Sequence, residues 1–131
     1  MNRRKLLFVS SALAAAAAAP PEDIAIQFHT DLEVKPGSEA ALLADFDRLF
    51  LPRIRRSAGF VDARLLKFRR ANVGSAPERY NYRLVQIFRS EELHEKWTVH
   101  ADHKIAWHEA IEKHVRTPFV AYLYDVNAKA V

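Results

Sequence analysis

The 131-residue chain contains no cysteine and only three glycines. Without cysteine, the protein has no disulfide scaffold, no thiolate nucleophile and no cysteine-ligated zinc or iron–sulfur site. The few glycines form no phosphate-binding loop, and neither a P-loop nor a dinucleotide-binding fingerprint is present. The length excludes a two-domain enzyme with a separate cofactor domain. Half of the residues are hydrophobic, which is enough for one packed core.

The first nineteen residues have the pattern of an export signal. Arg3 and Arg4 open a positively charged start, a short apolar stretch follows, and residues 12–19 are almost all alanine. The apolar stretch is shorter than the ~20 residues that cross a bilayer. Paired arginines are typical of the twin-arginine route, and an ordinary secretory signal is the alternative. We therefore expect residues 1–19 to be cleaved and 20–23 to be a linker. The mature protein would be exported, periplasmic or secreted, and without a stable membrane anchor.

The net charge of +4 belongs largely to this leader. Without Arg3, Arg4 and Lys5, the chain has 17 basic and 16 acidic residues and a formal charge of +1. Charge therefore gives no argument for a nucleic-acid partner, and we expect none.

Residues 24–126 have the pattern of a single β-α-β-β-α-β domain. Alternating hydrophobicity predicts strands over 24–34, 61–69, 80–89 and 119–126, and helical spacing predicts helices over 38–50 and 90–114. This order predicts an α+β, ferredoxin-like fold, with a four-stranded antiparallel sheet and two helices on one face. The other face keeps apolar residues, so we expect a homodimer. Residues 127–131 are expected to be a frayed tail.

Treated as one continuous helix, residues 90–114 carry an unusual stripe. Trp97, His100, Lys104, Trp107 and His108 fall on its apolar side. Two imidazoles and an ammonium group are costly to bury unless they are hydrogen-bonded or line a cavity. One interpretation is a pocket between this helix and the sheet. The other is ordinary core packing, in which the lysine reaches solvent and backbone groups satisfy the histidines.

The same helix offers no complete metal site. His100 and His103 are three residues apart and could share a metal ion, but the helix supplies no third ligand beside them. The serines lie in turn or cap contexts, and no nucleophile elbow is present. Neither a metal nor a serine triad is predicted.

Three stretches of the chain, taken in order, resemble the antibiotic biosynthesis monooxygenase family. They are Val34-Lys35-Pro36-Gly37, the segment from Ser57 to Leu66, and Val85-Gln86-Ile87-Phe88-Arg89-Ser90 with Trp97 seven residues beyond. The resemblance covers roughly residues 23–126. It implies a dimeric α/β barrel in which each subunit holds a small molecule between its sheet and its helices. Relatives include cofactor-independent oxygenases of anthrones and quinols, and haem-degrading oxygenases.

In the haem-degrading branch, a tryptophan of the second helix, an asparagine of the first strand and a histidine ten residues after the tryptophan matter. Trp97 matches the tryptophan. Thr30 stands nearest the asparagine position, and Trp107 stands at the histidine position with His108 next to it. Two of the three positions therefore differ from the pattern, which argues against haem degradation.

The resemblance and the stripe together predict an exported monooxygenase that uses no cofactor and oxidises a small quinol- or anthrone-like aromatic. We expect His100 or His108 to act as the base and Lys104 to stabilise the resulting anion. The residues expected to line the pocket are Trp97, Trp107, Thr30, Phe28 and Tyr82. One alternative is a non-catalytic dimeric module that binds a small ligand or haem. Another is a structural dimer whose own side chains fill the pocket.

Overall fold

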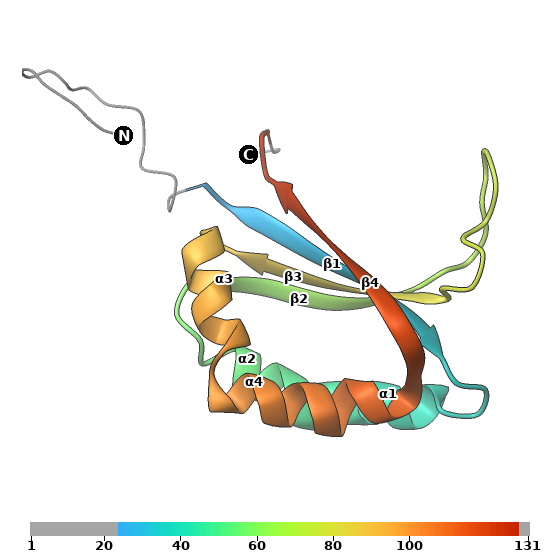
Figure 1. The fold of residues 1–131 in the computed structure, drawn as a ribbon, viewed down its shortest axis with the longest axis horizontal. Helices are drawn as coiled ribbons and strands as arrows, with labels where there is room; N and C mark the ends of the chain where they lie inside the picture. The colour runs from blue at the N-terminus through green and yellow to red at the C-terminus, as the bar shows by residue number, and fades with distance from the viewer. Residues whose placement is uncertain (1–23, 129–131) are drawn as a thin grey trace, which may run out of the picture.

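The computed structural model describes residues 24–128, so the predicted signal, the linker and the end of the tail lie outside the described residues. The strands are β1 (Ile26–Val34), β2 (Phe60–Lys67), β3 (Tyr82–Phe88) and β4 (Val115–Asp125). The helical segments are α1 (Glu39–Asp45), η2 (Phe46–Phe50), α2 (Leu51–Ile54), α3 (Glu91–Thr98), α4 (Ala101–Ala106), η3 (Trp107–Ile111) and η4 (Glu112–His114). The strands form one antiparallel sheet in the order β2-β3-β1-β4, and the helices cover one of its faces (Figure 1). This arrangement confirms the predicted ferredoxin-like α+β fold.

The two central strands place alternate residues against the helices, as the sequence predicted. On β1, Ile26, Thr30 and Leu32 are buried. On β3, the predicted face of Tyr82, Leu84, Gln86 and Phe88 is buried along its whole length. Each large apolar side chain buried in this way contributes roughly 1.5–3 kcal/mol to folding. The helix-facing side of the sheet is therefore the floor of the core.

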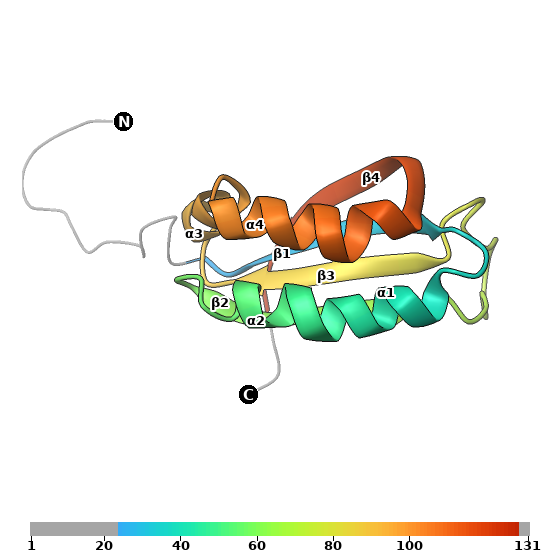
Figure 2. The same ribbon diagram turned by 90° about the horizontal axis from the view of Figure 1, so that it is seen from below.

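The helices form a second layer of two long runs that lie side by side (Figure 2). The first run joins α1, η2 and α2, and the second joins α4, η3 and η4. Leu42 and Phe50 of the first run and Ile111 of the second are fully buried. A buried polar contact also ties the runs together, because the His114 ring donates from Nε2 to Asp45 Oδ2 at 2.8 Å. That hydrogen bond holds the pKa of Asp45 below its usual range.

The prediction of one continuous helix over 90–114 is wrong. Ser90 caps α3, with its hydroxyl accepting from the Leu93 amide. However, α3 ends at Thr98, and His100 adopts an extended conformation before α4 begins. The His100 ring accepts from the Asp102 amide at 2.9 Å and so acts as the N-cap of α4. The break turns α4 relative to α3, so a wheel drawn through all 25 positions misplaces the residues beyond it.

The last strand also starts earlier than predicted. β4 begins at Val115, so Thr117-Pro118 lies within the strand rather than ending a helix. A proline is tolerated there because β4 is an edge strand and needs no amide on its outer side. Among residues 24–128, no helix is long and apolar enough to cross a membrane.

Candidate functional site

Trp97 lies at the centre of the layer between α3 and the sheet. It is 2% exposed, and its indole Nε1 donates to Gln86 Oε1 of β3 at 3.1 Å. Its ring also meets the edge of Phe50 with the ring centroids 6.2 Å apart. A buried indole N–H needs such a partner, and this one fixes the ring orientation across the helix–sheet boundary.

Two imidazoles flank Trp97. His94, one helical turn earlier, packs with its ring centroid 4.5 Å from Phe28 and 5.3 Å from Phe88. His103 of α4 meets the indole edge-on at 5.2 Å. Burial, assisted by the neighbouring His103, lowers the pKa of His94 to about 4. Burial, assisted by His108, also lowers the pKa of His103. Both rings are therefore neutral near pH 7.

The Nε2 atom of His94 is buried and has no hydrogen-bond partner among the described residues. A buried polar atom in this condition costs roughly 1–3 kcal/mol, and native proteins tolerate few of them. It lies in a mainly aromatic surrounding, between strands β1 and β3 and helix α3. We call the group of Phe28, Thr30, Gln86, His94, Trp97 and His103 the helix–sheet site.

Four of the five predicted lining residues lie in the layer between the helices and the sheet. Phe28 and Thr30 are on the helix-facing side of β1, and Trp97 is hydrogen-bonded to β3. Trp107 packs against Phe119 of β4, with the ring centroids 5.0 Å apart. The edge strand β4 lies beside this layer and is poorly covered. Its Leu123, which pairs with Phe28, is 42% exposed.

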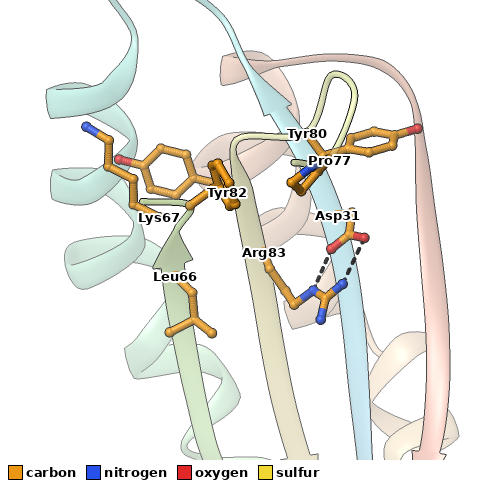
Figure 3. Close-up of a pocket in the computed structure, with 8 residues that line it drawn as sticks. Asp31, Leu66, Lys67, Pro77, Tyr80, Tyr82 and Arg83 are labelled. Atoms are coloured by element: carbon orange, nitrogen blue, oxygen red, sulfur yellow. Dashed lines mark hydrogen bonds and ion pairs between the residues drawn. The ribbon is translucent and has the colours of Figure 1, made fainter. Parts of the chain in front are cut away.

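Tyr82, the fifth predicted lining residue, lies away from the helix–sheet site and lines a separate cavity at the end of the sheet (Figure 3). It is at the start of β3, and its hydroxyl donates to Glu39 of α1. Burial and this hydrogen bond raise the pKa of Tyr82 to about 12. Tyr82 lies four residues before Gln86 on β3, so the two side chains are on the same face of the sheet. Tyr82 is nevertheless not part of the helix–sheet site.

The expectation that His100, Lys104 and His108 face the interior is wrong, because the helix breaks at residues 99–100. All three are exposed. His100 caps α4, and His108 contacts Glu112 one turn further on. The structure therefore does not bring the three predicted catalytic side chains together with the helix–sheet site.

The sequence analysis missed Gln86, His94 and His103 as site residues. Gln86 did carry a signal, since a glutamine stood on the predicted apolar face of a central strand. His103 was hidden by the assumption of a continuous helix, because it follows the break, whereas His94 precedes the break and its unpaired nitrogen has no signal in the sequence. Counted from the start of α4 alone, His103, Ala106, Trp107, Ala110 and Ile111 follow the spacing of a buried helix face.

A separate cavity of about 280 Å³ lies at the far end of the sheet, beneath the loop between β2 and β3 (Figure 3). Leu66 and Tyr80 supply apolar surface, and Asp31 and Arg83 point toward each other across its polar part. Arg83 donates to both carboxylate oxygens of Asp31, at 2.6 and 3.1 Å, and to His29 Nδ1 at 3.3 Å. These polar groups already hydrogen-bond to one another. They therefore leave a ligand fewer unpaired partners than the helix–sheet site does, where His94 Nε2 is unpaired.

Residues 24–128 contain no group of three or more histidine, cysteine, aspartate or glutamate side chains placed to hold an ion.

No family model matches the sequence, and no curated protein matches it. Solved structures do match its fold. SnoaB, a cofactor-independent oxygenase from Streptomyces nogalater, is 15% identical over 80% of this chain and 95% of its own, with a TM-score of 0.62. A candidate antibiotic biosynthesis monooxygenase from Bordetella bronchiseptica is 20% identical over 82% and 99% of the two chains, with a TM-score of 0.63.

A dimeric ferredoxin-like protein of unknown function from Jannaschia sp. also matches. It is 14% identical over 76% of this chain and 97% of its own, with a TM-score of 0.62. The chain has the ferredoxin-like fold of these proteins. Its neighbours in structure include a cofactor-independent oxygenase, a candidate antibiotic biosynthesis monooxygenase and a dimeric ferredoxin-like protein, so the fold that the resemblance implied is confirmed. Identities at this level show the fold and leave activity to be argued from the site.

Proposed function

We propose that the protein is a cofactor-independent monooxygenase of a hydroxylated, anthrone-like aromatic bound at the helix–sheet site. The observation that carries this proposal is the buried, unpaired Nε2 of His94 next to the fixed indole of Trp97. A neutral imidazole of low pKa is a weak base but a good hydrogen-bond acceptor for a phenol-type hydroxyl. Flat aromatic surface around it favours a flat aromatic ligand.

The proposed reaction is one that needs neither a metal ion nor a flavin, by analogy with the cofactor-independent oxygenase among the structural neighbours. Anthrone is in equilibrium with an enol that carries one aromatic hydroxyl, and its anion reacts with dioxygen. The ring CH₂ becomes a carbonyl: one oxygen atom enters the product and the other leaves as water with the two hydrogens. In this proposal the protein binds the ring and excludes water, and the enol hydroxyl donates its hydrogen bond to His94 Nε2. The enol proton passes to that nitrogen as the anion reacts with dioxygen and leaves in the water that is formed.

An entry route is supported by the exposure of β4. Ala121 and Leu123 pair with Thr30 and Phe28 of β1, so their side chains share the helix-facing side of the sheet. Both are exposed although the strand lies beside the site. A ligand could therefore approach along β4 without displacing a helix.

The proposal includes a homodimer that works outside the cytoplasm. The open face of the sheet carries exposed apolar side chains, among them Leu66, Tyr122 and Tyr124, which a second sheet would cover. A structural neighbour is itself a dimeric ferredoxin-like protein. Export rests on the sequence pattern of residues 1–19 alone.

The direct test is oxygen uptake with anthrone and the purified mature protein. We expect uptake of one dioxygen per anthrone above the uncatalysed rate. His94→Phe should lower kcat/KM by about tenfold or more, because one hydrogen bond in a buried site is lost. Trp97→Phe should lower it as well, and Glu95→Gln, an exposed neighbour on α3, should not.

Two outcomes would overturn the assignment in different ways. Anthrone binding without oxygen uptake would make the protein a binding module rather than an oxygenase. Uptake that is equal in wild type and His94→Phe would leave the oxygenase activity in place but remove the helix–sheet site from it.

A further inference from the structure

A second cavity, of about 240 Å³, lies on the outer side of α3, between the α2–β2 turn and the α3–α4 junction. Its apolar surface comes from Ala58, Leu93 and Trp97, and its rim carries Arg56, Lys96 and His100. It brings together Trp97 and His100, two of the residues predicted from the sequence to form a site, but the proposed oxygenase reaction does not use this space. We call it the outer pocket.

The outer pocket is continued by a smaller cavity of about 50 Å³ that reaches Arg53 of α2. Arg56, Trp97 and His100 line both spaces. Arg53 donates from Nη1 to the Leu49 carbonyl at 3.0 Å, but its Nε is buried and has no partner among the described residues. A guanidinium N–H left unpaired in this way is a strong donor that lacks an acceptor.

Two acidic side chains lie at the outer pocket, and one of them, Asp102, lines the smaller cavity together with Arg53 and Arg56. Asp102 accepts from Arg56 at 3.3 Å, and Glu92 lies 3.8 Å from Lys96. The Lys96–Glu92 pair is long and exposed and contributes little. The Arg56–Asp102 contact is a hydrogen bond to a carboxylate that is 31% exposed, so a ligand carboxylate at Arg56 has to displace Asp102. Arg53 has no carboxylate partner in the described part of the chain. The pocket therefore combines an apolar floor with an excess of positive charge.

We propose that the outer pocket binds an aromatic carboxylate, with the carboxylate between the guanidinium groups of Arg53 and Arg56, where it replaces Asp102 at Arg56, and the ring on the Trp97 side. The smaller cavity is large enough for one or two waters, which matches a carboxylate head group but not a ring. The larger cavity has the apolar surface for the ring. This site adjoins the helix–sheet site through Trp97, which lines both, but it does not rest on the proposed oxygenase activity.

Calorimetric titration with 1-naphthoate tests the outer pocket. The comparison ligands are 1-naphthalenemethanol, which keeps the ring and removes the charge, and inorganic phosphate, which keeps a charge and removes the ring. We expect 1-naphthoate to bind about tenfold or more tightly than either, and its affinity to fall as salt is raised. Equal affinity for 1-naphthoate and the alcohol, or for 1-naphthoate and phosphate, would overturn the proposal.

Variants then locate the binding. Arg53→Gln should weaken 1-naphthoate binding by about tenfold, because a charge-assisted hydrogen bond is lost. Arg56→Gln, at an exposed position that should tolerate substitution, should weaken it severalfold and serves if Arg53→Gln fails to fold. Arg55→Gln removes an exposed charge between them and should change it by less than about twofold. Equal effects at 53, 55 and 56 would indicate general surface attraction and contradict the site. His94→Phe should leave 1-naphthoate binding unchanged; a matching loss there would place the ligand in the helix–sheet site instead.

Discussion

The buried imidazole of His94 should make the stability of the folded protein depend on pH. Its pKa is lowered from 6.5 to about 4 in the folded protein. Between those values the unfolded chain takes up a proton that the folded protein does not, so stability falls as the pH drops from 6.5 toward 4. The loss attributable to His94 between pH 7.5 and pH 4.5 should be about 2–3 kcal/mol.

Urea denaturation at the two pH values measures this loss. His94→Phe should lose less stability on acidification than wild type, by about that amount. His108→Gln, which removes an exposed imidazole, should decline like wild type. A His94→Phe variant as acid-sensitive as wild type would contradict the burial of a neutral ring at this position.

At the residue scale, the sequence predicted correctly which face of the sheet a side chain occupies wherever hydrophobicity alternates along a strand. Phe28 and Thr30 were placed correctly because β1 has a strict period of two. Trp97 was placed correctly because it precedes the helix break. His94 was missed because no sequence pattern reports whether a buried nitrogen finds a partner, which depends on three elements that meet in space.

At the scale of elements, the break between α3 and α4 determines which side chains beyond Thr98 face the sheet. Thr98 returns a hydrogen bond from its hydroxyl to the Glu95 carbonyl, and His100 caps the next helix. These local side-chain contacts compete with continued helix, and they give His100 a capping role. Hydrophobic periodicity alone does not detect such a break, since both helices remain amphipathic on their own.

The strand boundaries show the same limit. The fold was predictable because six elements with clear periods allow few topologies. The start of β4 was not, because Thr117-Pro118 looks like a helix stop in sequence and is tolerated in a strand only at a sheet edge. Edge position is a property of the assembled sheet.

At the scale of the whole molecule, the open face of the sheet predicts the oligomeric state. On this face, Leu66 is 46% exposed and Tyr124 is 50% exposed. Such exposure of apolar side chains to water is unfavourable in a monomer. Wild type should sediment as a dimer at micromolar concentration. The double variant Leu66→Lys, Tyr124→Lys should sediment as a monomer, because two charges would have to be buried in the interface.

The matched control for this experiment is Leu43→Lys. Leu43 is 47% exposed on α1, in the helix layer on the other side of the sheet. It should leave the dimer intact. A wild-type monomer, or a double variant that still sediments as a dimer, would show that the open face is not the interface.

The central claim is that the helix–sheet site recognises an aromatic hydroxyl through His94 Nε2. The most direct measurement is the affinity of 1-naphthol against that of 1-methoxynaphthalene, which has the same ring and cannot donate a hydrogen bond, for wild type and His94→Phe. We predict that wild type prefers 1-naphthol by about tenfold and that His94→Phe loses this preference while still folding at pH 7. Equal affinity of wild type for the two ligands, or a preference that survives in His94→Phe, would contradict the claim.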